Sequence, residues 1–259
     1  MPVPPARLLA ASALTVAALV TVSGCLGSVP DRVARHVPGS PAAEQAPQAS
    51  PGAKPALTQA QARAALITEA DLGVPWGPTE GIATWRDGLL KAVTNVPECQ
   101  RLLDALYADE LLGEPSGTSA VTSLDDGDDQ AQLRYRVAAH RRADAERTLT
   151  WLRTLPGACA QFTAATTVAG LQSVQVSETQ LPQVGDDRQG LRVTLTGQAN
   201  EDEQPTILTM DVAVVLAGDD AIVLTDGALG ELPADATRQA LEVGTQRLAQ
   251  IRERGRALA

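Results

Sequence analysis

The chain has 259 residues, of which 44% are hydrophobic and 20% charged, and its formal net charge is −10. These values are typical of a globular protein with one or two domains. The negative charge argues against a nucleic-acid binder, because phosphate contacts need clustered lysine and arginine, and against attachment to anionic lipid by charge alone. Aromatic residues make up only 2%, so the core must consist mainly of Leu, Val, Ile and Ala.

Residues 1–24 have the pattern of a bacterial lipoprotein signal peptide. Arg7 is the only charge before Asp31, and an apolar stretch at 8–22 is shorter than the ~20 residues of a spanning helix. The segment Val22-Ser23-Gly24-Cys25 then resembles a lipobox. This resemblance implies a diacylglycerol on the Cys25 thiol, cleavage before Cys25 and N-acylation of the new terminus. The alternative is an uncleaved membrane anchor with a chance cysteine.

Residues 25–56 follow as a stretch rich in Pro, Ala, Ser and Gln, without apolar periodicity. Such a composition cannot bury a core, so we expect a disordered tether behind the lipidated Cys25. We expect one folded domain at 57–259. Lipidation would place this domain on the outer side of the cell membrane, with the membrane as a partner through the lipid.

Helical patterns begin the predicted domain. Thr58 and Gln61 match a capping box, which predicts a helix that ends near Gly73. A second helix is predicted over 97–112, with Pro97 in its first turn. Strands are predicted at 118–124 and 131–140, around the acidic turn DDGDD.

A third helix is predicted over 141–156. Alternating patterns then predict five strands at 160–168, 170–180, 190–199, 206–218 and 221–227, and a last helix follows Pro233. Successive strands with short turns indicate an antiparallel sheet. The predicted class is therefore α+β, with the helices packed mainly on one face of the sheet.

Cys99 and Cys159 are the only other cysteines. In an oxidising compartment such a pair is expected to form a disulfide, which would pin two helical segments together. A redox-active or metal-binding pair is the alternative, but no C-x-x-C spacing supports it. We expect no metal and no cofactor.

Several polar and aromatic residues have both a structural and a functional interpretation. The motif GDD occurs at 127–129, 185–187 and 218–220, which indicates solvated turns or weak divalent-ion binding. His140 is expected to end a strand at the surface. Trp76 and Trp85 lie in a segment rich in Gly and Pro, where they would either line a ligand cleft or cover the core.

Four segments resemble the PknH-like extracellular sensor domain, a family found on bacterial receptor kinases and on envelope lipoproteins. They are ALITEADLG (65–73), PECQRLL (97–103), TWLRTLPGACAQFT (150–163) and LPQVGDDRQGLRVTL (181–195). The resemblance would cover most of 57–258. It implies an antiparallel sheet with packed helices, a groove for a ligand and no known reaction. Kinase-attached members often carry two disulfides, whereas this chain can form one.

Three functions follow from these observations as hypotheses. The first is a lipid-anchored, non-catalytic binding or sensor protein for an unknown envelope molecule or envelope protein. The second is a structural or assembly lipoprotein of the envelope. The third is a cell-wall or lipid hydrolase acting through Asp186 or Asp211, although neither acid has an obvious catalytic partner in the sequence.

Overall fold

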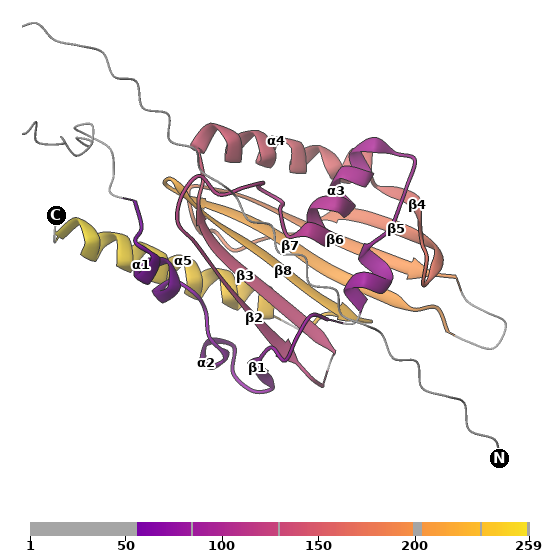
Figure 1. The fold of residues 1–259 in the computed structure, drawn as a ribbon, viewed down its shortest axis with the longest axis horizontal. Helices are drawn as coiled ribbons and strands as arrows, with labels where there is room; N and C mark the ends of the chain where they lie inside the picture. Colours follow the sequence, from indigo (N-terminus) through magenta and orange to yellow (C-terminus); the bar gives the residue numbers. More distant parts are fainter. Residues whose placement is uncertain (1–55, 84, 129, 199–203, 234, 258–259) are drawn as a thin grey trace, which may run out of the picture. The chain divides into compact units, whose positions relative to one another are not determined.

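The computed structural model describes residues 56–83, 85–128, 130–198, 204–233 and 235–257. They contain an antiparallel sheet of eight strands in the order β1-β2-β3-β8-β7-β6-β5-β4 (Figure 1). The predicted α+β class is confirmed. The strands are β1 (Trp76–Pro78), β2 (Ser119–Asp126), β3 (Ala131–Ala139), β4 (Gln161–Thr166), β5 (Gly170–Glu178), β6 (Asp187–Gly197), β7 (Ile207–Ala217) and β8 (Asp220–Leu229).

Helices cover both faces of the sheet, so the expectation that they lie mainly on one face needs correction. On β7, Val212 and Val214 belong to one apolar cluster, whereas Ala213 and Val215 belong to another on the opposite face. The uninterrupted apolar run 212–216 is the pattern of a strand buried on both faces. The helices are α1 (Gln59–Ala64), α2 (Glu69–Leu72), α3 (Pro97–Ala108), α4 (Arg142–Ala158) and α5 (Ala236–Ala257), with a π-helix, η1 (Arg86–Leu90).

We call the face under α3 and α4 the α4 face, and the face under α1 and α5 the α5 face (Figure 1). The α4 face buries the side chains of β4 to β8 against Leu149, Leu152 and Leu155 of α4. The α5 face buries those of β3, β7 and β8 against Leu241 and Leu248 of α5. Leu241 and Leu248, two helical turns apart, therefore belong to an apolar stripe of α5 that faces the sheet.

Capping explains why the first predicted helix is two short ones. Thr58 forms the predicted capping box with Gln61 and starts α1. A second capping box, between Thr68 and Asp71, interrupts the pattern and starts α2. The second predicted helix ends early, at Ala108, because Asp109 adopts a left-handed conformation with φ 57° and binds Arg86 and Arg134 through its carboxylate.

The predicted disulfide is present between Cys99 and Cys159, with their Cα atoms 5.7 Å apart. Cys99 lies in the first turn of α3, and Cys159 follows the last residue of α4. The bond therefore joins the start of one helix to the end of the other, within the core of the α4 face. Among the described helices, none has the length and apolar character to cross a membrane. Cys25 and the predicted tether lie outside the described residues.

Candidate functional site

Trp76 and Trp85 do not form a common ligand cleft. Trp76 lies in β1 and packs into the cluster of the α5 face, whereas Trp85 packs into the cluster of the α4 face. Both side chains are buried. Trp85 lies close to Gly227, where a β-carbon would come within 3 Å of the indole. The structure thus places the two rings on opposite sides of the sheet, in the positions of core residues.

A groove lies instead between α1, α5 and two of the Gly-Asp turns, and we call it the α1–α5 groove. Its volume is about 540 Å³. It begins at Ala56, the first described residue, and runs along the C-terminal half of α5. The main side chains of its lining are Leu57, Gln61, Asp186, Asp219, Leu248, Ile251, Arg252 and Arg256.

Glycine is required where one of these turns borders the groove. Gly185 has φ +69°, and a β-carbon there would lie 2.4 Å from the Val215 side chain and 2.6 Å from the Leu216 carbonyl oxygen. The backbone N–H of Asp186 donates to the same carbonyl at 2.7 Å. The segment before β6 is therefore fixed against the end of β7. The 218–220 copy of the motif forms the tight turn between β7 and β8.

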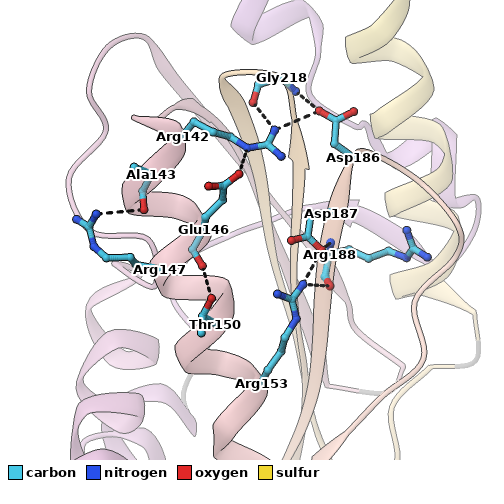
Figure 2. A network of polar contacts seen from close by, with 10 residues as sticks. All are labelled: Arg142, Ala143, Glu146, Arg147, Thr150, Arg153, Asp186, Asp187, Arg188 and Gly218. Atoms are coloured by element: carbon cyan, nitrogen blue, oxygen red, sulfur yellow. Dashed lines mark hydrogen bonds and ion pairs between the residues drawn. The ribbon is translucent and has the colours of Figure 1, made fainter.

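Arginines of α4 hold these turns in place, as Figure 2 shows. The Asp186 carboxylate accepts from the backbone N–H of Gly218 at 2.7 Å and from Arg142 at 3.3 Å. Arg142 also donates to the Gly218 carbonyl and to Glu146. Farther along α4, Arg153 donates to the Asp187 carboxylate. Asp186 is therefore a structural partner of the second turn, because its carboxylate accepts hydrogen bonds from within the protein.

A buried ion pair lies at the groove. The Asp220 side chain is fully buried and accepts from Arg252, with an Nε–Oδ2 distance of 2.6 Å. Burial raises the pKa of Asp220, and the hydrogen bond and positive charge of Arg252 act in the opposite direction. Arg252 follows Leu248 by one helical turn, so a charged residue on the apolar stripe was the sequence signal for this pair. Sequence reasoning missed it.

Asp211 lies in a second depression of about 590 Å³, between the segments 179–182 and 231–238. Arg192 of β6 donates two hydrogen bonds to its carboxylate, at 2.8 and 2.9 Å. In the register of β7 with β8, Asp211 lies opposite Asp226. Asp226 is 1% exposed, and its carboxylate accepts a hydrogen bond from the Thr237 hydroxyl of α5. Burial raises the pKa of Asp226 to about 7, and the negative charges of Asp211 and Asp126 act in the same direction.

The two acids of the hydrolase hypothesis are thus separated. Asp186 borders the α1–α5 groove and Asp211 lies in the other depression. Each is held by an arginine, Arg142 or Arg192. A general base needs a lone pair directed at a substrate proton, and Arg192 takes one lone pair on each oxygen of Asp211. Asp226 was missed, although a charged residue in an apolar strand is a recognisable signal.

His140 is buried, so the expectation of a surface position was wrong. Its exposed fraction is 6%, and its backbone N–H donates to the Asp219 carbonyl at 3.0 Å. Burial, followed by the positive charge of Arg136, lowers the pKa of His140. His140 lies between the end of β3 and the start of α4. Within the described ranges, no group of three or more His, Cys, Asp or Glu side chains is arranged to hold a metal ion.

No protein-family model matches this chain, and no curated protein matches it. Two solved structures are similar to it. The extracellular domain of PknH from Mycobacterium tuberculosis is 13% identical, with 78% of this chain and all of that chain covered and a TM-score of 0.43. A putative uncharacterized protein from Mycobacterium smegmatis, an Rv0999 ortholog, is 17% identical, with 77% and 100% covered and a TM-score of 0.38. Similarity at these scores carries no functional argument.

Proposed function

We propose that this chain is a lipid-anchored, extracytoplasmic binding protein, and that the α1–α5 groove holds a small molecule with a largely apolar body. The single observation that carries the proposal is the groove. Its volume of about 540 Å³ is in the range of small-molecule sites, roughly 300–1,000 Å³. Its apolar side chains, among them Leu57, Leu248 and Ile251, stand beside a few charged groups, which is the usual composition of such sites.

The position of the groove supports a sensing role. It starts at Ala56, where the predicted tether from Cys25 meets the domain. A ligand in the groove would touch α1, the first folded element after the tether, and α5, the last element of the chain. Occupancy would therefore stabilise the packing of the first helix on the last one, next to the point of attachment.

The charged residues of the groove suggest binding without a reaction. Asp186 is paired with Arg142, and Arg252 of the lining is paired with the buried Asp220 beside the groove. Arg256 lines the groove near the end of α5, and its side chain is exposed. It could receive a polar or anionic end of the ligand. We propose no catalytic role for these residues, because none of them forms a nucleophile–base pair.

Native mass spectrometry of the chain from residue 25, with Cys25→Ser, tests the proposal. We expect protein that has been incubated with a lipid extract of the bacterial envelope and then purified to carry an additional mass that is lost on denaturation. Ala249→Trp places a large side chain in the groove from an exposed position on α5 and should abolish that mass. The matched control, Ala143→Trp on the exposed surface of α4, should retain it. A bare mass in all three proteins would contradict ligand binding and favour a structural or assembly role.

A further inference from the structure

Within the part of the chain that the structure describes, the α5 face is covered over only half of its width. Helices α1 and α5 pack on the half formed by β2, β3, β8 and β7. The strands β4, β5 and β6 continue the same sheet (Figure 1). Every second residue of β4 from Gln161, of β5 from Leu171 and of β6 from Arg192 points to this side. Most of these residues are exposed, and we call this surface the uncovered face.

The uncovered face is almost free of charge. Apart from Arg192 it consists of Ser, Thr, Gln, Ala and Leu. Arg192 is already held by two hydrogen bonds to Asp211. The edge strand β4 likewise contains neither a charge nor a proline, the two common devices that keep sheet edges apart. In a chain with 20% charged residues, the absence of lysine, glutamate and aspartate from this face is one compositional signal of an interface centre, whereas its Ser and Ala residues are not.

Apolar side chains are concentrated at one end of this face. Val93 pairs with Ala165, and Ala165 lies opposite Leu171 in the β4–β5 register. Cross-strand partners point to the same side of a sheet, so these three side chains form a row. Val93 is 69% exposed and Leu171 is 49% exposed. Ile207 extends the apolar end through its register with Thr196, and it is 37% exposed.

We infer that the uncovered face is the contact surface between two copies of this chain. Ser, Thr and Gln side chains each carry both donors and acceptors, so a face made of them can hydrogen-bond to an identical face. A charged face cannot, because it needs the opposite charge. A two-fold axis brings the same patch of both copies together. Since each chain carries a net charge of −10, an uncharged face is also where two copies approach with the least repulsion.

Sedimentation equilibrium of the full mature chain with Cys25→Ser tests this inference. We expect a reversible dimer over about 1 to 100 μM, with a dissociation constant on the order of 10 μM. Ser173→Arg with Thr194→Arg puts two like charges on the uncovered face of each copy and should weaken the dimer at least tenfold. The control, Thr150→Arg with Thr154→Arg on the exposed surface of α4, should leave the dimer unchanged.

Two outcomes would overturn the inference: a monomer at every concentration, or a dimer that survives the arginines at 173 and 194. Far-ultraviolet circular dichroism and the melting temperature report whether that double variant folds. If it does not, the single variant Gln175→Arg replaces it, at an exposed position of the same face. The groove variant Ala249→Trp should not alter the dimer, so the failure of this inference and that of the proposed ligand site can be distinguished.

Discussion

The two faces of the sheet are built in different ways. The α4 face is a continuous apolar core under α3 and α4, with the Cys99–Cys159 bond inside it. The α5 face has a smaller core under α1 and α5, contains the buried acids Asp220 and Asp226, and leaves half of its width uncovered. The comparison indicates that one face supplies most of the stability, and that the other holds the groove and the surfaces available for binding.

Removal of the disulfide, which lies in the core of the α4 face, should produce the largest decrease in the free energy of unfolding. By loop entropy, a bond across a sequence separation of 60 residues contributes about 4 kcal/mol to the free energy of unfolding. We expect Cys99→Ala with Cys159→Ala to lose about this amount in urea unfolding. Reduction of the wild type with dithiothreitol is the control and should give the same loss. A loss below about 1 kcal/mol would mean that the α4 face does not depend on the bond.

Asp226→Asn should stabilise the α5 face at neutral pH. An ordinary aspartate has a pKa of 3.8, whereas burial raises the pKa of Asp226 to about 7. Between these values the unfolded chain releases a proton that the folded chain keeps, so the stability of the wild type decreases as pH rises. We expect the variant to be more stable by roughly 3 kcal/mol at neutral pH and equal at about pH 4.

Urea unfolding across this pH range measures the difference between the variant and the wild type. The exposed Asp128→Asn is the matched control and should show a constant, small difference. An Asp226→Asn variant that is less stable than the wild type at neutral pH would show that the ionised carboxylate is stabilised by its surroundings, notably by Thr237 and Arg192.

Two neighbouring residues of β6 compare the covered and uncovered sides directly. Val193 is fully buried on the α4 face, whereas Thr194 points to the uncovered face. We expect Val193→Ala to cost roughly 2 kcal/mol in the free energy of unfolding, because it leaves a cavity. Thr194→Ala should change it by no more than about 0.5 kcal/mol. Chemical denaturation of the monomer, at a concentration below the dimer's dissociation constant, checks both values; similar losses would contradict the assignment of the two sides.

A smaller effect than that of Val193→Ala is expected at the mouth of the groove. Thr58 accepts a hydrogen bond from the backbone N–H of Gln61 and starts α1. Thr58→Ala should cost about 1 kcal/mol, and hydrogen exchange should report faster opening in 59–64 than in α4. Thr58→Ser keeps the hydroxyl and should restore protection. Equal protection in all three proteins would mean that packing, and not the cap, holds α1 in place.

Local chemistry made most elements predictable. Seven of the eight strands lie within a few residues of their predicted bounds, because each side of the sheet imposes a period of two on the sequence; the three-residue β1 (Trp76–Pro78) was not predicted. The capping box at Thr58 and Pro97 in the first turn of α3 were confirmed for similar local reasons. The disulfide was predicted from the expected lipidation of Cys25 and the oxidising compartment that it implies, which would leave few alternatives for one remaining pair of cysteines.

The site was much less predictable. Trp76 and Trp85 were chosen because they are aromatic residues in a loop, and they lie in separate cores. The α1–α5 groove joins segments that are far apart in the chain, from Leu57 to Arg256. No local sequence pattern predicts that two Gly-Asp turns, α1 and α5 meet at one end of the sheet.

The sequence by itself determined the class of fold, seven of the eight strands, the starts of α1, α3, α4 and α5 and the cysteine pair, because these depend on periodicity, capping and composition within short segments. Only the tertiary structure decided which face each helix covers, where the groove lies and which side of β4, β5 and β6 has no helix over it. The physical reason is that an apolar stripe predicts that one face of a helix is buried, but it does not predict which side of the sheet the helix packs against. That choice depends on the strand order β1-β2-β3-β8-β7-β6-β5-β4, which places β3 beside β8 through contacts distant in sequence.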